Sequence, residues 1–134
     1  MRVFVSHSSR DTWIARQMAR CIQDCGVDVL IDAYDLLSGD DVNDRISDLL
    51  DRASEMVVLL TYASKGRAWV WMEVGVMRMS LKRRVVPVFH GITRQDLAES
   101  GGDGALAGLV DRQLNDFDLY LAELKGRVTR ETTP

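Results

Sequence analysis

The chain of 134 residues is long enough for one globular domain and too short for two independent hydrophobic cores. Its net charge of −3 leaves no general basic surface, so we expect no direct binding of nucleic acid. The one basic cluster, 82–84, is interpreted as a solvated loop that suits the negative end of the preceding helix. Neither a secretory signal nor a run of 18 apolar residues occurs, so we expect a cytoplasmic protein without a membrane span.

Short β-branched runs alternate with stretches of helical periodicity, which is typical of βαβ units and a parallel sheet. The third run is apolar throughout, as a strand covered on both faces should be. A two-sided α/β fold with helices between the strands is therefore predicted. The expected strands are 2–6, 27–31, 56–60 and 85–89, with a short edge strand in 109–114.

Helical spacing of apolar residues follows the first strand and recurs along the chain. In the first helix the apolar stripe includes both cysteines, Cys21 and Cys25, and Gly26 is expected to end it. No C-x-x-C pair occurs and the histidines lie elsewhere, so we expect buried free thiols and no metal site. The tail 129–134 is polar and expected to fray. The later expected helices are 42–53, 68–81, 93–100 and 116–128, with a glycine loop at 101–104.

Three polar loops, 6–11, 32–41 and 61–67, follow the carboxyl ends of expected strands. In an open parallel sheet, ligands bind in the crevice at this edge. Backbone N–H groups and the hydroxyls of Ser8 and Ser9 would suit a phosphate at the start of the first helix. The alternative is that Ser9 or Asp11 only caps that helix.

Glu73 is a carboxylate on a predicted helix that is apolar on most of its sides. Helical spacing places it on one face with Trp69, Met72 and Val76. Burying an unpaired charge is costly, so this side chain must be paired, neutralised or used. Two interpretations stay open at this point: a functional carboxylate close to the loop edge of the sheet, or a structural one that pairs with a basic neighbour.

Three segments resemble the motifs of one known family, the Toll/interleukin-1 receptor (TIR) domains. VFVSHSSRD at 3–11 resembles the family's opening strand and first loop. VLIDAYDLLSGD at 29–40 resembles its second strand and signature BB loop. VVLLT at 57–61, followed by Trp69-x-x-x-Glu73, resembles its third strand and Trp-x-x-x-Glu helix. Order and spacing hold over about residues 2–90, so the chain is identified as a TIR domain, over 1–128, followed by the polar tail.

The resemblance implies a flavodoxin-like three-layer α/β/α fold with a five-stranded parallel sheet. Many animal members of the family act by protein–protein contact, whereas plant, bacterial and one neuronal branch cleave NAD+ at the nicotinamide–ribose bond. In that branch the Glu that matches Glu73 is required, and no cofactor beyond the NAD+ substrate is implied. Bacterial members often act as antiphage effectors, which implies self-association through TIR–TIR contacts. It also implies a sensor module, either beyond Pro134 or in a partner chain.

One carboxylate suffices for this chemistry. The nicotinamide ring is cationic in NAD+ and becomes neutral as it leaves, so its departure needs no general acid. Whether water or an adenine nitrogen attacks, giving a linear or a cyclic product, stays open. Ser38, where the family often has Pro, and the bulky Trp71 depart from the family pattern. By the resemblance, the nucleotide side is lined by Ser6, Ser8, Ser9 and Arg10, the nicotinamide end is covered by Asp35, Leu36 and Leu37, and Trp69 either stacks on a ring or packs in the core.

The first competing hypothesis is a non-catalytic TIR interaction module that assembles through 32–41 and the helix beginning at Val42. A receiver-type phosphoacceptor would need acidic residues after the first strand and an Asp ending the third, where Leu60-Thr61 stands. A nucleoside deoxyribosyltransferase-like enzyme shares the layout and a catalytic Glu, but the BB-loop match disfavours it. A Rossmann dehydrogenase lacks support, because the first strand–helix turn carries no glycine-rich fingerprint.

Overall fold

A computed structural model describes residues 1–31, 48, 50–64, 68–98 and 102–132 of the chain. Within these residues, five strands form one parallel sheet in the order β2-β1-β3-β4-β5. This order is that of flavodoxin-like doubly wound folds, and it confirms the predicted five-stranded parallel sheet. The strands are β1 (Arg2–Ser6), β2 (Asp28–Ile31), β3 (Glu55–Leu60), β4 (Arg84–Phe89) and β5 (Arg112–Gln113).

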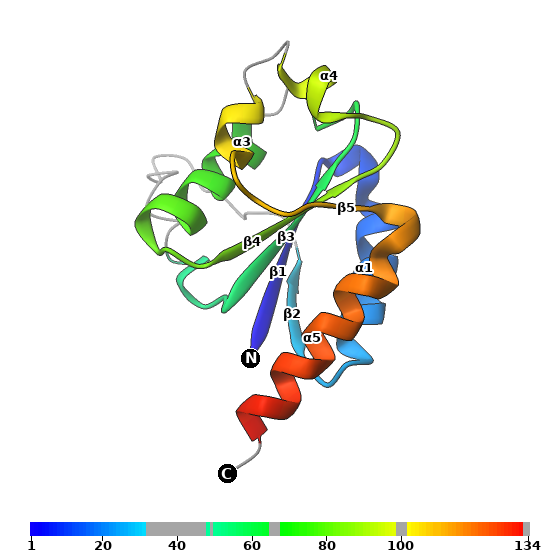
Figure 1. The fold of residues 1–134 in the computed structure, drawn as a ribbon, viewed down its shortest axis with the longest axis vertical. Helices are drawn as coiled ribbons and strands as arrows, with labels where there is room; N and C mark the ends of the chain where they lie inside the picture. The colour runs from blue at the N-terminus through cyan, green and yellow to red at the C-terminus, as the bar shows by residue number, and fades with distance from the viewer. Residues whose placement is uncertain (32–47, 49, 65–67, 99–101, 133–134) are drawn as a thin grey trace, which may run out of the picture.

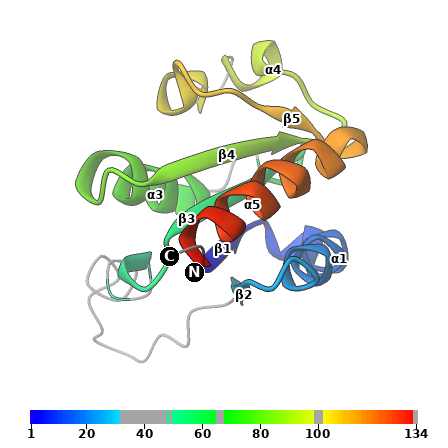
Figure 2. The ribbon, with the colours of Figure 1, turned by 60° about the horizontal axis from the view of Figure 1, so that its bottom comes forward.

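Helices cover both faces of the sheet, as Figures 1 and 2 show. The helices α1 (Thr12–Gln23) and α5 (Phe117–Thr132) lie against one face, and α3 (Ala68–Gly75) lies against the other. A π-helical turn, Val76–Ser80, continues α3. The described residues also contain α4 (Arg94–Ala98) and short 3-10 turns at Ser9–Asp11, Gly102–Leu106 and Leu114–Asp116.

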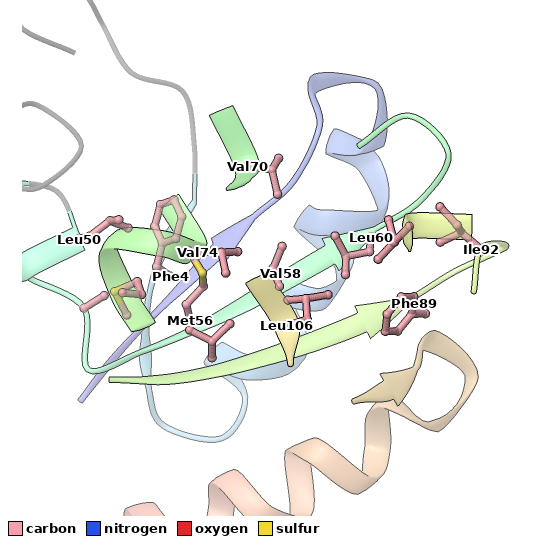
Figure 3. Packing of buried hydrophobic residues seen from close by; sticks show 14 residues of the cluster. Phe4, Leu50, Met56, Val58, Leu60, Val70, Val74, Phe89, Ile92 and Leu106 are labelled. Atoms are coloured by element: carbon pink, nitrogen blue, oxygen red, sulfur yellow. The ribbon is translucent and has the colours of Figure 1, made fainter. Parts of the chain in front are cut away.

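The central strand β3 is buried over its whole length, as its apolar sequence predicts. Its side chains alternate between two hydrophobic clusters, one on each face of the sheet. On the α3 face, Val58 of β3 and Phe4 of β1 belong to the same cluster as Val70 and Val74 of α3, and Figure 3 shows these residues together. On the other face, α1 and α5 supply the cover. The α3 helix is therefore fixed to the sheet by its own apolar side chains.

Several boundaries differ from the predicted ones. The last helix continues to Thr132, so residues 129–132 are helical rather than a frayed tail. Gly102–Leu106 forms a 3-10 turn where a glycine loop was expected, and the edge strand contains only Arg112–Gln113. The N-terminal part of the expected helix 42–53 lies outside the described residues. These differences arise at element ends, where local sequence patterns specify least.

The prediction of two buried thiols is wrong, because Cys21 is exposed and Cys25 is half-buried. The buried stripe of α1 is rotated from the expected one and uses small residues as well as large ones. Both thiols are free, and burial raises the pKa of Cys25. The fully covered residues of α1 are Ala15, Met18, Ala19 and Ile22.

Charged side chains organise the amino edge of the sheet, where the strands begin. The carboxylate of Glu55, the first residue of β3, accepts hydrogen bonds from the Tyr120 hydroxyl (2.7 Å) and from Arg127 Nη2 (2.7 Å). Nearby, Arg83 donates to the carbonyls of Leu50 and Ala53 at distances of 3.1 and 2.7 Å. The basic cluster 82–84 is therefore not merely solvated, since the Arg83 side chain caps the end of the helical segment that contains Leu50 and Asp51.

Candidate functional site

The carboxyl edge of the sheet, where the strands end, gathers most of the buried polar side chains that the structure describes. In a parallel sheet of this order, this edge is where ligands bind. A buried polar side chain must be hydrogen-bonded or it costs free energy, so such a group marks either a structural network or a binding site. The buried polar residues at this edge or on α3 are Ser6, Ser8, Thr61, Ser64 and Glu73, and the one at the amino edge is Glu55.

Glu73 lies in the second turn of α3 and is only 2% exposed. It stands five residues after Ala68, the first residue of the helix, which is about 7.5 Å along the helix axis. Glu73 is buried, as the apolar helix around it predicted. The residues predicted to share its helix face, however, are not the residues of α3 that are fully buried. Met72 and Val76 are only partly covered, whereas Val70, Val74 and Met77 are buried. A helix that is apolar nearly all round does not reveal its core-facing side by periodicity alone.

Ser6, the last residue of β1, is 1% exposed and lies on the same side of the sheet as α3. It alternates with Phe4, and it is in register with Val58; both of these residues belong to the α3-side cluster. Among the described residues, the Ser6 hydroxyl has no hydrogen-bond partner. A buried hydroxyl without a partner is destabilising unless a ligand or water completes it. Ser6 and Glu73 thus both face the layer between the sheet and α3.

His7 follows directly after β1 and was not among the predicted site residues. Its Nδ1 atom is buried and, within the described part of the chain, makes no hydrogen bond. Its Nε2 atom lies 3.5 Å from the hydroxyl oxygen of Thr12. In the sequence, His7 is marked only by its position in the polar loop after the first strand. That position does not distinguish it from the other polar residues of the loop.

The first loop caps the short turn that precedes α1. The Ser8 hydroxyl accepts a hydrogen bond from the backbone N–H of Arg10 (3.4 Å), and the side chain is buried. Ser8 therefore caps this turn, whereas Asp11, one of the two alternatives that the sequence left open, occupies the N-cap position of α1 without a capping hydrogen bond from its side chain. Ser9 and Arg10 are exposed at this edge. Their hydroxyl and guanidinium groups are thus accessible to an anion.

A hydrogen bond joins the first loop to the turn that follows β3. The hydroxyl of Thr61 donates to Asp11 Oδ2 over 2.6 Å, across 50 residues of sequence. The same hydroxyl accepts from the backbone N–H of Ala63 (3.1 Å). The Ser64 hydroxyl in turn accepts from the backbone N–H of Thr61 (2.7 Å) and donates to its carbonyl (2.9 Å). Two loops that are distant in sequence are therefore fixed to one another at the carboxyl edge.

Comparison with known proteins decides the family. A family profile described as TIR domain matches residues 3–124, which is most of the chain. The chain belongs to the TIR domain family. Over 126 residues it is 26% identical to a 2' cyclic ADP-D-ribose synthase of Bacteroides thetaiotaomicron, covering 91% of this chain and 44% of that protein. It is 27% identical over 101 residues to a 2' cyclic ADP-D-ribose synthase of Acinetobacter baumannii, covering 72% of this chain and 38% of that one. The chain thus spans less than half the length of either relative.

Solved structures share the fold of this TIR domain at low sequence identity. The TIR domains of the activated Roq1 resistosome align with a TM-score of 0.65 and 13% identity, covering 98% of this chain and 99% of theirs. The TIR domain of a Toll-related receptor from Hydra magnipapillata aligns at 0.60 with 11% identity, covering 96% and 95%. A diflavin flavoprotein from Nostoc aligns at 0.61 with 16% identity, covering 97% and 94%. The last similarity agrees with the flavodoxin-like fold that the strand order indicates.

Some predicted site residues of the TIR domain lie outside the described part of the structure. Asp35, Leu36 and Leu37 fall in the segment 32–47, and the side chain of Trp69 is not described although its backbone belongs to α3. Among the described residues, no group of three or more His, Cys, Asp or Glu side chains is arranged to hold a metal ion. None of the helices in those residues combines the length and apolar character needed to cross a membrane. The structure thus assembles Ser6 and Glu73 on one side of the sheet, with the first loop at its edge.

Proposed function

We propose that this TIR domain cleaves NAD+ at the nicotinamide–ribose bond and that Glu73 is the catalytic carboxylate. The observation that carries the proposal is the burial of Glu73 on α3, near the ligand-binding edge of a doubly wound sheet. Hydrophobic packing alone does not favour a carboxylate among Val70, Val74 and Met77, because its charge must be desolvated. A buried ionisable group at a binding edge is a candidate for chemistry.

The reaction itself needs little more than a well-placed negative charge. When the bond between nicotinamide nitrogen and ribose carbon breaks, both electrons leave with nicotinamide, which becomes neutral. Positive charge then develops on the ribose carbon and its ring oxygen, and a nucleophile adds to that carbon and releases a proton. A carboxylate in a water-poor layer stabilises this oxocarbenium-like transition state electrostatically. Glu73 is assigned that task.

The remaining groups of the edge suit the rest of the substrate. The Ser6 hydroxyl faces the same layer as Glu73 and can hydrogen-bond a ribose hydroxyl. Ser9 and Arg10, exposed in the first loop, can bind the diphosphate, because guanidinium and hydroxyl groups are good phosphate donors. The proposal also assigns the nicotinamide end to Asp35, Leu36 and Leu37, with Trp69 beside the rings.

The curated relatives support this proposal by their names. Both are called 2' cyclic ADP-D-ribose synthases, and a cyclic ADP-ribose can form from NAD+ only after the nicotinamide bond breaks. We therefore include a cyclised product beside ADP-ribose in the proposal. We also propose that the domain acts in an antiphage effector activated by clustering of TIR domains. Two large exposed aromatic side chains, Trp13 and Tyr62, offer apolar surface for such contacts.

The test is product analysis of NAD+ incubated with the wild-type chain and with Glu73→Gln. We expect the wild type to release nicotinamide with either ADP-ribose or a cyclised form, resolved by chromatography and mass. Glu73→Gln should lower the rate by about 100-fold or more, since it keeps the shape and removes the charge. Assays over a range of protein concentrations, and on a crowding support, test clustering through a rise in specific activity. No nicotinamide release under any of these conditions would favour the non-catalytic interaction module instead.

A further inference from the structure

We propose that the hydrogen bond between Thr61 and Asp11 is a positioning device that holds the first loop ready for NAD+. The inference rests on the proposed function, since it assigns a role to residues beside that same site. The Thr61–Asp11 bond, called the loop clamp below, joins the loop that carries Ser9 and Arg10 to the turn after β3. Asp11 and Thr61 are positioning residues, and they are not assigned any contact with the substrate.

The Thr61 side of the loop clamp is rigid. Thr61 follows directly after the central strand and is 6% exposed. Its hydroxyl is used twice, donating to Asp11 (2.6 Å) and accepting from the N–H of Ala63 (3.1 Å), so the direction of its proton is fixed. The two bonds with the Ser64 hydroxyl hold the turn itself. The hydroxyl that donates to Asp11 is therefore held in place at the end of the central strand.

On the other side of the loop clamp, the Asp11 side chain does not follow the usual capping preference. Asp11 occupies the N-cap position of α1, where an Asp normally accepts hydrogen bonds from the first turn of the helix. Here its side chain makes no capping hydrogen bond and instead accepts from Thr61. Departures from local preference of this kind are expected where a functional geometry is being held.

The loop clamp completes a frame around the proposed nucleotide contacts. Ser6, at one end of the first loop, is fixed in β1, and Asp11, at the other end, is fixed to Thr61. Ser9 and Arg10 lie between these two anchors and are exposed. Without the clamp, the loop would populate other arrangements, and the apparent affinity for NAD+ would fall with the fraction that remains competent. Glu73 lies on α3, which packs against the sheet through its own apolar side chains. The rate of the chemical step should therefore change little when the clamp is removed.

The experiment is a kinetic double-mutant cycle on NAD+ cleavage with Thr61→Val, Asp11→Ala and the double variant. Thr61→Val keeps the side-chain shape and removes the hydroxyl; we expect KM to rise about tenfold, the value of a charge-assisted hydrogen bond, with kcat changed by less than about twofold. Asp11→Ala should behave alike, and the double variant should be no worse than either single one, because both lose the same bond. Thr61→Ser, which keeps the hydroxyl, should restore KM. Asp11→Ala, at a half-buried position, supplies the same readout if Thr61→Val fails to fold.

The chain offers a matched control in Thr93→Val. The Thr93 hydroxyl donates to Asp96 Oδ2 (3.1 Å) at the start of α4, so this variant removes a bond of the same type outside the first loop and the turn after β3. Its KM should equal that of the wild type. Thermal unfolding of each variant shows whether a rise in KM simply follows lost stability, which is the outcome a merely structural bond would give.

The outcomes separate the loop clamp from the proposed function. If the wild type cleaves NAD+ and Thr61→Val keeps its KM within about twofold, the loop clamp is wrong and the proposed function stands. The loop clamp is equally wrong if the two single variants are additive or if Thr93→Val raises KM to the same extent. If the wild type binds NAD+ without cleaving it, the proposed function fails and the clamp is judged on the dissociation constants measured by calorimetry. A wild type that neither binds nor cleaves NAD+ overturns both.

Discussion

The two edges of the sheet differ in how completely their buried polar groups are hydrogen-bonded. At the amino edge, Glu55 accepts hydrogen bonds from Tyr120 and Arg127, and this network ties α5 to the central strand. At the carboxyl edge, the Ser6 hydroxyl and the His7 Nδ1 atom are buried without a hydrogen bond from the described residues. A completed network stabilises a fold, whereas a buried polar group without a protein partner can form a hydrogen bond with a ligand or water. This contrast supports the proposal that the carboxyl edge is used for recognition, whereas the amino-edge network stabilises the fold.

The largest effect is expected from Arg127→Met, which breaks the amino-edge network. The side chains of Arg127 and Glu55 are 17% and 3% exposed, so the variant leaves a buried carboxylate without its cationic partner. Removing one partner of such a pair costs about 3–5 kcal/mol of unfolding free energy. Urea denaturation measures it.

The control is Arg112→Met, which breaks the more exposed ion pair with Glu123 and should cost no more than about 1 kcal/mol. Equal losses of unfolding free energy in the two variants would show that the buried Glu55 network adds no more stability than an exposed ion pair.

A smaller effect is expected at alkaline pH. Burial, and then the Glu55 carboxylate, raises the pKa of Tyr120 well above its ordinary value of 10.0. Below pH 10.0 the Tyr120 hydroxyl is protonated in both the folded and the unfolded state, and its full contribution to stability is present. As pH rises above it, only the unfolded state loses the proton, so folding should weaken by about 1 kcal/mol per pH unit until the folded pKa is reached.

The measurement is the difference between wild type and Tyr120→Phe in urea denaturation at about pH 8 and about pH 10.5. The variant should be less sensitive to the change. Equal sensitivity of the two chains would show that Tyr120 does not keep its proton through the Glu55 network.

The smallest effect on stability is expected from Ser6→Ala. The hydroxyl has no hydrogen bond within the described residues, so its removal should leave the unfolding free energy within about 1 kcal/mol of the wild type. The proposed contact with the ribose should nevertheless raise KM for NAD+. A clear loss of stability with unchanged KM would instead place Ser6 among the structural groups.

Much of the fold could be predicted because strand patterns are local. The apolar run of β3 and the alternation of strands and helices indicated the sheet, and the burial of Glu73 followed from the helix around it. The side of α3 on which Glu73 lies could not be predicted, because that helix is apolar nearly all round.

Contacts between distant residues left no signal in the sequence. The Thr61–Asp11 bond spans 50 residues, and Arg83 caps a helix end some 30 residues earlier in the chain. Neither partner of such a pair stands out by itself. The exposure of Cys21 and the cap made by Ser8 were missed for a related reason, since helix starts and the edges of apolar stripes depend on packing that short sequence patterns do not record.

The most direct test of the division between the two edges compares Glu55→Gln with Glu73→Gln, two carboxylates that are each 2% exposed. NAD+ cleavage and urea denaturation would be measured on both variants beside the wild type. We expect Glu73→Gln to lose about 100-fold or more in cleavage rate while its unfolded fraction stays negligible under assay conditions. Glu55→Gln should lose unfolding free energy, about 1–3 kcal/mol, and still cleave NAD+ where it is folded. Cleavage at the wild-type rate by a folded Glu73→Gln chain would contradict the assignment of Glu73 to catalysis.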